Sequence, residues 1–583
     1  MYDPALPRSR VFLPAMLSGI LLYISFFPLN LGFLGWIALV PLLSLLRANA
    51  RPRRIYFATF VGGLIFYVPA IQWMRVAHPA MYGAWLFLAF CCALFLVMSL
   101  WLARKLIRVG VPDWLAVPIA FVAVEYFRSH FPTGYTWLDM FGVRNPIGFG
   151  WYMLGHTQHG FLFLIQFADI TGVYGVSFLV ALVNAALWKS IARPARVRRW
   201  LRDSNPLPAY SIRPTLAAFV LFISAILYGS ITVGEGPAAE YGPQVALIQG
   251  NLPQDIKNEH GSEMEDHFGN LADDAAFPKD GRPWPDLVVW PETSFVYPWF
   301  DVAEGLKLRE LDNKFWVEDP LAQMTPEQNR YWRFRRDLAG TRPIFAKTIE
   351  RRNVPMLFGL NGVQWEADDK SWKYNSALLL DRDGKYLGRY DKMHLVPLGE
   401  YVPMKETLPF LSAFTPYEGD YSCKPGTMWT RFPLKVGERT YHFACIICYE
   451  DTDATLARHY VRPNEEGVDF FVNISNDGWF HGTAEHEQHL AICRFRAIET
   501  RRSVVRAVNM GISAIIDPNG IVAALPGPTW GESKAVAGIV RGWVPIGAGT
   551  TIYARFGDWL PVACWFILIG GFVRGFILRR RMS

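Results

Sequence analysis

Charge is scarce in this sequence. Only 19% of the 583 residues are charged, whereas 51% are hydrophobic and 15% are aromatic. This shortage excludes an ordinary water-soluble protein of this length and indicates membrane spans. The apolar residues fill 1–235 and 559–583, whereas 240–555 has the charge density of a soluble domain. We therefore expect a membrane part and a water-soluble part.

Cysteines are also few. There are seven, and an odd number argues against a scaffold held only by disulfides. Cys91, Cys92 and Cys564 lie in apolar runs. Cys445 and Cys448 have the spacing of a redox or zinc pair, but no second ligand pair stands at metal spacing. That alternative stays open beside the expectation of no metal and no cofactor.

Eight apolar runs are long enough to cross about 30 Å of hydrocarbon. They are 11–27, 31–47, 55–73, 81–103, 113–128, 170–189, 214–233 and 557–578. The stretch 129–169 between them is aromatic and rich in glycine, without a clean span, and is interpreted as an interfacial or re-entrant loop.

Basic residues lie in every second connection between these runs and at both ends of the chain. They are Arg8, Arg10, Arg47, Arg51, Arg53, Arg54, Arg104, Lys105, Arg108, Lys189, Arg193, Arg196, Arg198, Arg199, Arg202, Arg579, Arg580 and Arg581. The alternate connections are nearly free of them. By the positive-inside rule, both termini are expected to be cytoplasmic and the soluble domain extracytoplasmic. The net charge of +7 belongs largely to these loops, so no nucleic-acid partner is expected.

The chain is expected to divide into a helical transmembrane domain of about seven spans (1–240), an α/β catalytic domain (241–548), and a last transmembrane helix with a basic tail (549–583). Strands are predicted at 244–249, 286–290, 355–360, 375–380, 386–390, 440–447, 468–474, 503–508, 512–516 and 521–525. Helices are predicted at 264–276, 334–351, 453–461 and 485–501. Turn residues at 381–384 and 518–520 predict two hairpins. The charged segment 297–345 shows weak strand character and is interpreted as an insertion or a mobile flap.

Two polar residues follow predicted strands and suggest chemistry. Glu292 ends an apolar strand, where α/β folds place their sites and where partial burial would make it a base. Lys392 follows a hairpin strand, where an amine can stabilise an oxyanion, and Glu400 could orient it. Taken singly, a surface glutamate and an exposed Lys–Glu pair are the simpler explanations. His394 is expected to be structural.

A third polar residue, Cys448, stands where an apolar strand is predicted to turn into a helix. Free backbone N–H groups and the helix dipole at such a turn favour a thiolate and can form half of an oxyanion hole. Glu450 and Asp451 would stabilise the helix start even without a catalytic role. Cys445, three residues earlier, is expected to point to the other face and to lie in the core.

A strand-end Glu, a Lys after a later strand and a Cys at a strand-to-helix turn occur here in the order typical of the nitrilase superfamily. The soluble domain resembles that superfamily throughout. The resemblance implies an αββα sandwich in which the Glu activates the thiol, the Cys forms a thioester and the Lys stabilises the tetrahedral oxyanion.

Such a domain between seven spans and a last one is similar to the apolipoprotein N-acyltransferase family. The similar stretches are 247–254 (LIQGNLPQ), 290–293 (WPET), 374–376 (YNS), 394–403 (HLVPLGEYVP), 447–450 (ICYE), 473–480 (NISNDGWF) and 553–559 (YARFGDW). The resemblance places the catalytic triad on Glu292, Lys392 and Cys448. It places supporting, substrate-binding roles on Glu400, Tyr449 and Glu450.

The resemblance also implies a reaction. A membrane phospholipid donates an acyl chain to Cys448, and the N-terminal amine of a diacylglyceryl-cysteine lipoprotein accepts it, as the last step of lipoprotein maturation. The implied location is the inner membrane with the catalytic domain on the periplasmic side, and a monomer is expected. Aromatic residues of 129–152 and 401–421 are candidates for a lipid-facing rim, although a plain interfacial belt explains them equally well.

Three features depart from the family pattern: Asn258 replaces an aromatic residue, 481–487 is unusually polar, and 297–345 is inserted. Two other functions stay open. A membrane-anchored nitrilase-type amidase would act on a soluble amide without phospholipid. A transporter with an accessory domain would need ionisable residues within its spans, and few are present, Glu125 and Arg574 being the examples.

Overall fold

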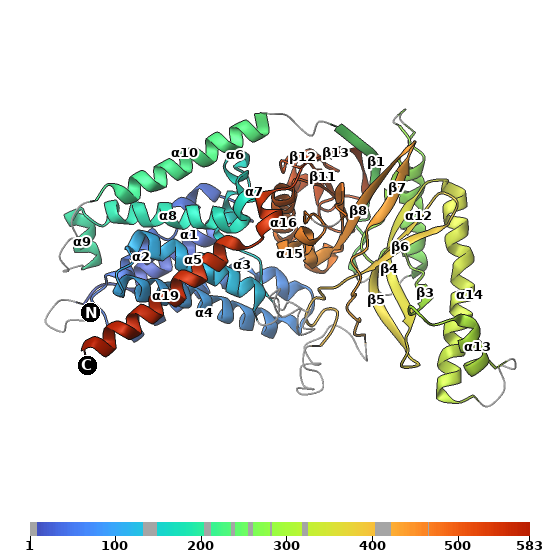
Figure 1. The fold of residues 1–583 in the computed structure, drawn as a ribbon, viewed down its shortest axis with the longest axis horizontal. Helices are drawn as coiled ribbons and strands as arrows, with labels where there is room; N and C mark the ends of the chain where they lie inside the picture. Colours follow the sequence, from blue (N-terminus) through green and yellow to red (C-terminus); the bar gives the residue numbers. More distant parts are fainter. Residues whose placement is uncertain are drawn as a thin grey trace.

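The computed structural model describes residues 8–131, 148–202, 211–234, 240–254, 261–279, 281, 283–317, 324–402, 421–463, 466–547 and 549–582. A helical part and a part built on two β-sheets lie side by side along the long axis of the molecule (Figure 1). The chain starts in the helical part, passes through the sheets and returns to the helical part with its last helix.

The helical part contains most of the first 234 residues and the last 32. Its elements are α1 (Phe12–Ser25), η1 (Gly32–Trp36), α2 (Val40–Leu43), η2 (Ser44–Leu46), α3 (Pro52–Ala70), η3 (Gln72–Val76), α4 (Met81–Arg108), α5 (Asp113–His130), η5 (Leu154–Gln158), α6 (Leu162–Ile165), α7 (Ala168–Thr171), α8 (Val173–Ile191), α9 (Ala195–Leu201), α10 (Arg213–Gly234), α18 (Ile552–Phe556) and α19 (Trp559–Met582). Within the described ranges, four helices are long and apolar enough to cross a membrane: Met81–Arg108, Val173–Ile191, Arg213–Gly234 and Trp559–Leu578. The expected spans near 55–73 and 113–128 form helices of 19 and 18 residues that are not among these four.

The first two expected spans differ from the prediction. α1 has 14 residues, which at about 1.5 Å per residue is shorter than the hydrocarbon core. The run 31–47 is not one helix but the short pieces η1, α2 and η2. η1 packs closely on η5, because a Cβ on Gly32 would lie 2.0 Å from the carbonyl oxygen of Thr157.

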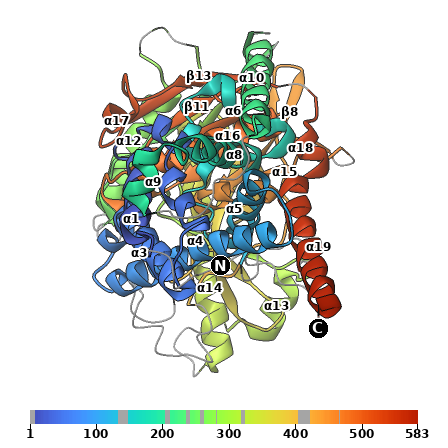
Figure 2. The ribbon, with the colours of Figure 1, turned by 90° about the vertical axis from the view of Figure 1, so that its left-hand side faces the viewer.

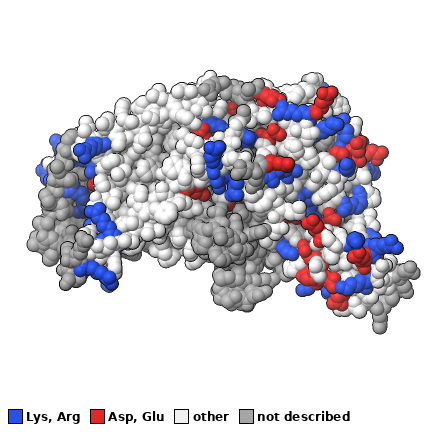
Figure 3. Space-filling model, in the orientation of Figure 1, with Lys and Arg blue, Asp and Glu red and all other residues white. Residues whose placement is uncertain are grey.

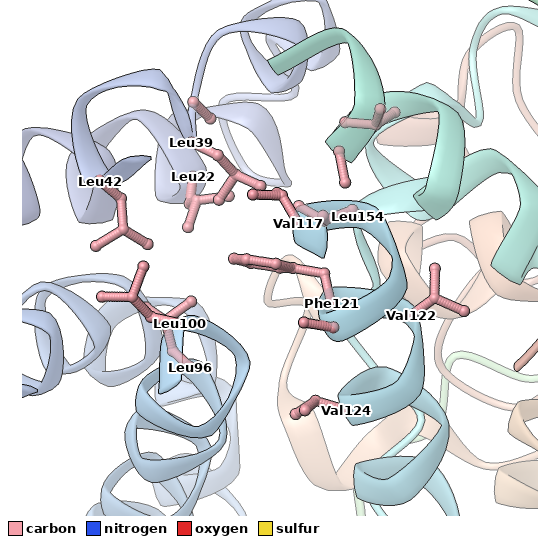
Figure 4. Close-up of a cluster of buried hydrophobic side chains, with 14 of the residues drawn as sticks. Leu22, Leu39, Leu42, Leu96, Leu100, Val117, Phe121, Val122, Val124 and Leu154 are labelled. Carbon is pink, nitrogen blue, oxygen red and sulfur yellow. The ribbon is translucent and has the colours of Figure 1, made fainter. Parts of the chain in front are cut away.

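A continuous apolar core holds the helices together. Side chains of α1, α2, α4, α5 and η5 contribute to it, and Phe121 points from α5 towards Leu22 and Leu100 (Figure 4). Ionisable residues inside this part serve packing: Glu125 accepts a 2.7 Å hydrogen bond from the Leu154 backbone N–H. Arg128 donates to the Tyr67 hydroxyl and the Trp151 carbonyl, each at 2.7 Å. These contacts anchor the 148–154 segment and give no support to a transport pathway.

The basic connections meet at one end of the helical part. The backbone N–H of Ser9 donates to the carbonyl of Asn49 at 3.1 Å, and that of Arg10 to the carbonyl of Leu201 at 3.0 Å. Arg104 reaches the carbonyl of Leu45 at 3.3 Å. Lys and Arg side chains therefore collect at the end remote from the sheets, and a nearly uncharged belt follows (Figure 3).

Two helices, α10 and α19, lie at the periphery of the helical part (Figure 2). Only 17% of the most apolar stretch of each is buried within the protein. Their exposed side chains are large and apolar, such as Phe219, Ile231 and Phe566. Such faces are compatible with lipid and not with water.

The second part contains two β-sheets. One has seven strands in the order β13 (Gly538–Ile546), β1 (Glu240–Gln249), β2 (Leu287–Val289), β4 (Met356–Trp365), β5 (Ser371–Leu380) and β6 (Tyr386–Asp391), with β3 (Trp299–Val302) paired to β4. The other has six strands in the order β12 (Val522–Ala524), β11 (Ala514–Ile516), β10 (Ser503–Val508), β9 (Phe470–Ser475), β8 (Arg439–Ile447) and β7 (Phe432–Val436). The central pairs β1–β2, β2–β4, β8–β9 and β9–β10 are parallel, and the flanking pairs β4–β5, β5–β6, β7–β8, β10–β11, β11–β12 and β1–β13 are antiparallel.

The two sheets and their helices form four layers. Side chains of both sheets, such as Leu247 and Phe443, meet in one core between the sheets. α12 (Gly261–Ala276) and α14 (Pro326–Arg352) cover the outer face of the seven-stranded sheet. α15 (Ala454–His459) and α16 (Glu485–Thr500) cover the other outer face. The opposite side of α16 packs on the helical part through Ile492 and Phe495. The predicted αββα sandwich is confirmed, and one of its helices packs against the helical part.

The predicted strands and helices of the sandwich are confirmed, as are both hairpins. β3, β7 and β13 were not predicted. The segment 297–345 is not strandless, because β3 opens it and α13 (Leu308–Phe315) and the first part of α14 follow. These elements enclose a small core around Tyr331 and Trp365. The domain limits expected from the sequence stay predictions.

Candidate active site

The three predicted triad residues each follow the carboxyl end of a strand. Glu292 comes shortly after β2, Lys392 directly after β6 and Cys448 directly after β8. β2 and β6 belong to the seven-stranded sheet and β8 to the six-stranded sheet. The side chains of Glu292 and Lys392 are 6% and 1% exposed. The site therefore lies where the strand ends of the two sheets meet, largely shielded from solvent.

The position of Glu292 depends on a glycine in the neighbouring strand. A Cβ on Gly359 of β4 would lie 2.0 Å from the carbonyl oxygen of Pro291 and 2.9 Å from the Cα of Glu292. Only a residue without a side chain allows this loop to pack so closely on β4. Thr293, directly after the glutamate, adopts a left-handed φ of 46° and turns the chain away. The carboxylate is thus held by a tight, fully packed turn.

Lys392 lies between two carboxylates. Its Nζ is 3.2 Å from Oε1 of Glu292 and 2.9 Å from Oε2 of Glu400. Burial alone lowers the pKa of Lys392, but Glu292 and then Glu400 outweigh it and raise that pKa well above the usual value. The side chain therefore keeps its positive charge at neutral pH. An ammonium has three N–H donors, so two carboxylates leave one for a third acceptor.

Asn375 on β5 joins the same two carboxylates. Its Nδ2 donates to Oε1 of Glu292 at 2.6 Å and to Oε1 of Glu400 at 2.7 Å. The backbone carbonyl of Asn375 accepts a hydrogen bond from the backbone N–H of Lys392 at 2.8 Å. Glu400 is fixed further by the backbone N–H of Val396, at 2.7 Å from Oε2. Asn375 thus sets the spacing of three charged side chains, a role that the sequence did not suggest.

Cys448 has an unusual backbone. Its φ is 52°, a left-handed conformation that is rare for residues other than glycine. It starts η7 (Cys448–Thr452), and α15 follows almost at once. The predicted strand-to-helix turn is therefore confirmed, and its first residue has a strained backbone. Strain of this kind concentrates at functional positions.

The surroundings of the thiol raise its pKa, whereas the sequence predicted that the helix start would favour a thiolate. Burial raises the pKa of Cys448, the negative charge of Glu292 raises it further, and Lys392 only partly opposes them. The result lies well above the ordinary value, because desolvation disfavours a thiolate. Cys448 is therefore protonated at neutral pH, and nucleophilic attack requires a base beside it. Glu292 is near enough to influence the thiol electrostatically.

Cys445 belongs to the core between the sheets, as predicted. The parity argument that separated it from Cys448 does not apply, because Cys448 lies beyond the end of the strand and also contacts that core. All cysteines of the described residues are free. The two thiols differ in burial, since Cys445 is fully buried and Cys448 only partly exposed.

Glu450 ties the lysine loop to the cysteine turn. Its Oε1 accepts from the Tyr390 hydroxyl at 2.9 Å and from the backbone N–H groups of Met393 and His394 at 2.7 and 3.1 Å. Its Oε2 accepts from the backbone N–H of Ile447 at 2.8 Å. Glu450 is fully buried and so acts as a scaffold between the loops.

Tyr449 and His394 hold the rim of the site. The Tyr449 hydroxyl donates to the carbonyl of Gly148, which joins the cysteine turn to the helical part. His394 contacts Asp453 at 3.3 Å through Nδ1, the structural role expected of it.

A buried cluster of charges lies behind the cysteine turn. Arg506 of β10 donates to Oδ2 of Asp477 at 2.8 Å and to Oδ2 of Asp451 at 3.3 Å. His489 of α16 lies between the same acids, with Nε2 at 2.9 Å from Asp451 and Nδ1 at 3.2 Å from Asp477. Glu485 completes the cluster, 3.5 Å from Nδ1 of His489. Asp477, Glu485 and His489 have their ligand atoms within 4.8 Å of one another, but the Arg506 guanidinium already supplies the positive charge there.

This cluster predicts a pH-dependent stability. Burial and Arg506 lower the pKa of His489, but Asp451 and Asp477 outweigh them and raise it to about 10. Because the folded state holds the His489 proton more tightly than the unfolded state, this proton stabilises the fold fully below the unfolded pKa of about 6.5. The contribution is lost as the pH rises through the folded pKa of about 10. We expect the melting temperature of the protein to fall between these pH values.

The matched variant is His489→Gln, which keeps a polar side chain without a titratable group. Its melting temperature should be lower than that of the unchanged protein at pH 6.5, and the difference should shrink towards pH 10. A constant difference across this range would contradict the role given to His489.

Comparison with known proteins agrees with this arrangement. A family model described as "Apolipoprotein N-acyltransferase N-terminal domain" matches residues 18–186, and one described as "Carbon-nitrogen hydrolase" matches residues 284–543. A curated apolipoprotein N-acyltransferase of Geobacter metallireducens is 32% identical over 99% of this chain and 97% of its own length. The chain belongs to the apolipoprotein N-acyltransferase family. It is an acyltransferase of the nitrilase superfamily.

Other relatives are more distant. The apolipoprotein N-acyltransferase of Rhodopirellula baltica is 27% identical over 93% of both chains. Among solved structures, Nit3 of Saccharomyces cerevisiae, a member of the nitrilase superfamily, covers 53% of this chain and 93% of its own, with 17% identity and a TM-score of 0.31. An amidase of Nesterenkonia sp. covers 56% of this chain, with 14% identity and a TM-score of 0.34.

Three sequence-based interpretations fall on residues outside those that the structure describes. They are Asn258, the central part of the aromatic stretch 129–152, and most of the 401–421 stretch. Within the polar segment 481–487, Glu485 and His486 are buried. Asp477 lies in the similar stretch 473–480, but its burial behind the cysteine turn cannot be predicted from the sequence. The signal for the residue itself in the sequence is that Asp477 is an acidic residue within a run of apolar and amide side chains.

Proposed function

We propose that this protein transfers an acyl chain from a membrane phospholipid, through a thioester on Cys448, to the N-terminal amine of a diacylglyceryl-cysteine lipoprotein. The observation that carries the proposal is a protonated, partly exposed thiol next to a Glu–Lys–Glu charge set, on a domain packed against lipid-compatible helices. The membership of the family supports N-acylation of lipoproteins in general.

In the first half-reaction, Glu292 takes the thiol proton and Cys448 attacks the ester carbonyl of the phospholipid. The remaining N–H of Lys392 donates a hydrogen bond to the tetrahedral oxyanion. The two neighbouring carboxylates keep this lysine positively charged. When the intermediate collapses, the C–O bond breaks and Glu292 returns the proton to the leaving oxygen. The products are an acyl thioester and a lysophospholipid.

In the second half-reaction, the lipoprotein amine attacks the thioester carbonyl. Glu292 accepts an amine proton, Lys392 again stabilises the oxyanion, and the C–S bond breaks. The departing sulfur recovers the proton from Glu292, which restores the thiol. Both halves use the same base and the same oxyanion donor, as a ping-pong reaction requires.

Burial of the site suits this chemistry. The thioester must persist until the acceptor amine binds, and water would hydrolyse it during that time. The strand ends that carry the site adjoin the helical part, where Tyr449 contacts Gly148. Lipid substrates can therefore reach the thiol from the membrane surface without entering bulk water.

We also propose an orientation and an oligomeric state. The arginine-rich end of the helical part faces the cytoplasm, and the sandwich lies on the periplasmic side of the inner membrane. We propose a monomer, since one chain supplies all three triad candidates and the chemistry needs no second copy.

The alternative is an anchored amidase of the nitrilase type. The two functions differ in their need for lipid, so the test supplies the purified full chain with either phospholipid and a diacylated lipopeptide or a simple soluble amide. We expect a lipopeptide heavier by one acyl chain and a lysophospholipid released in equal amount. Ammonia release from the amide with no acylated lipopeptide would contradict the proposal.

Glu400→Gln is expected to slow the reaction without unfolding the protein. Lys392 keeps Glu292 as a partner, but it loses the carboxylate at 2.9 Å that orients it and raises its pKa. We expect kcat to fall by about 10- to 100-fold, the effect of a weakened oxyanion donor, with little change in melting temperature. The control is Glu366→Gln, which changes a carboxylate near Lys424 on the rim of the same sheet. Equal activities of the two variants would make Glu400 a structural residue.

A further inference from the structure

An open groove of about 460 Å³ lies where the sandwich meets the last membrane helix. Its walls come from α5, α15, the end of α18 and the first turns of α19. The lining residues are Tyr126, Thr455, Arg458, Phe556, Asp558, Trp559, Val562, Ala563 and Phe566. Neither the triad candidates nor Glu400 line it. Its volume lies within the range of about 300–1,000 Å³ typical of small-molecule sites.

The α19 side of the groove is apolar. Phe566 is 69% exposed, Phe556 is 61% exposed, and Val562 and Trp559 are each about two-fifths exposed. These side chains continue the uncharged surface of a helix that is mostly unburied in the protein. In a membrane this wall faces acyl chains.

The α15 side of the groove carries a cation. Arg458 donates through Nε to the carbonyl of Ala554 at 3.0 Å and through Nη2 to that of Arg555 at 3.1 Å. These two bonds fix the guanidinium at the end of α18. Arg458 makes no ion pair with any carboxylate in the described part of the chain, and the neighbouring Asp558 accepts from the Tyr553 hydroxyl at 2.8 Å. The charge is thus positioned, partly buried and without an anionic partner.

We propose that this groove binds one glycerophospholipid that does not react, with its phosphate on Arg458 and an acyl chain along Val562 and Phe566. An apolar wall on a membrane helix and a guanidinium without a carboxylate partner beside it match the two halves of that molecule. Arginine is well suited to phosphate, because its planar N–H groups pair with two oxygens. The Trp559 ring stands at the boundary, where aromatic residues commonly meet lipid headgroups.

Such a lipid would connect the catalytic turn to the membrane. α15 follows the Cys448 turn almost directly, and α19 is the last membrane helix. A molecule that contacts both holds the sandwich at a fixed height above the bilayer. This role is separate from the acyl donor, and it rests on the membrane location alone and not on the thioester chemistry.

The test uses photo-crosslinking on the purified full chain in phospholipid nanodiscs. The probe is a phosphatidylglycerol with a diazirine near the middle of one acyl chain, and digestion with mass spectrometry locates the label. We expect labelling of the 556–566 segment above that of the equally exposed side chains of α10, such as Phe219 and Leu227. A diacylglycerol with the same diazirine chain, which has no phosphate, should label this segment no more than α10.

Two variants and one control test the contacts. Arg458→Gln should reduce labelling of this segment by about tenfold, the loss expected for a charge-assisted phosphate contact. Val562→Trp, which fills the groove from its exposed side, should reduce it as well. Arg555→Gln removes an exposed charge at the same height that does not line the groove, and its labelling should be unchanged.

Unchanged labelling in Arg458→Gln, or equal labelling by the diacylglycerol, would show that apolar chains alone occupy the groove and would overturn the proposal. Labelling spread evenly over α10 and α19 would overturn it too, because it would indicate ordinary lipid contact. Labelling of active-site segments serves as an internal standard. Absence of that labelling in the unchanged protein would argue against the proposed acyl donor and leave the groove proposal unaffected.

Discussion

Cys448→Ala is expected to reduce acyl transfer to the lipopeptide by more than about a thousandfold, because no other group replaces the bond-forming sulfur. Lys392, Glu292 and Glu400 keep their mutual contacts in this variant, so the charge set stays intact. The melting temperature should change little, since Cys448 is only partly buried. The measurement is the initial rate of lipopeptide acylation, with folding followed by thermal unfolding.

Cys445→Ala is the matched control. This cysteine lies three residues earlier and is fully buried between the sheets. Its loss should lower stability by about 1 kcal/mol through a small cavity and leave the rate close to normal. Similar rates for the two variants would exclude Cys448 as the nucleophile.

Glu292→Gln is expected to separate two properties of the thiol that usually change together. The carboxylate of Glu292 raises the pKa of Cys448, so its removal should lower that pKa and leave Lys392 to stabilise the thiolate. Alkylation of Cys448 by iodoacetamide should therefore reach half its maximal rate at a lower pH than in the unchanged protein. Acyl transfer should nevertheless fall by about 100- to 10,000-fold, because no group then carries protons to the leaving oxygen and from the amine.

The pair of measurements discriminates between two roles. If alkylation and acyl transfer both fell, Glu292 would serve to hold the thiol in place. If acyl transfer stayed within a few fold of normal, the proton-transfer role would be wrong. Asn375→Asp is a useful comparison, because it disturbs the same carboxylate without removing it.

The sequence was sufficient to predict the strands after which the triad candidates stand, for a local reason. Glu292 and Cys448 are polar residues that follow apolar runs, and such runs become buried strands, whereas Lys392 follows a hairpin strand marked by its turn residues. The unpredicted strands lack that signal. β7 contains Pro433, and β13 contains Gly542 and Pro545, which interrupt a strand pattern although both strands lie at sheet edges where they are tolerated.

Properties that arise from distant contacts were not predictable. Asn375 meets Glu292 across 83 positions of the sequence, and nothing in its own segment marks it as a bridge. The high pKa of Cys448 follows from burial and from Glu292, whereas the sequence pointed only to the favourable local turn. The same limit applies to the run 31–47, which forms the short pieces η1, α2 and η2 and packs on η5. The local sequence pattern therefore predicts where the strands end, whereas long-range packing determines the pKa values and contacts of the residues that follow them.

The central claim is that the acyl chain rests on Cys448 between the two half-reactions. The most direct test incubates the purified protein with phospholipid alone, then digests it and weighs the peptide that contains Cys448. The account predicts a mass increase of one acyl chain that hydroxylamine removes and that disappears when a diacylated lipopeptide is added, with the acyl group recovered on the lipopeptide amine. Full-rate acylation of the lipopeptide with no acyl group on Cys448 at any time after mixing would contradict it.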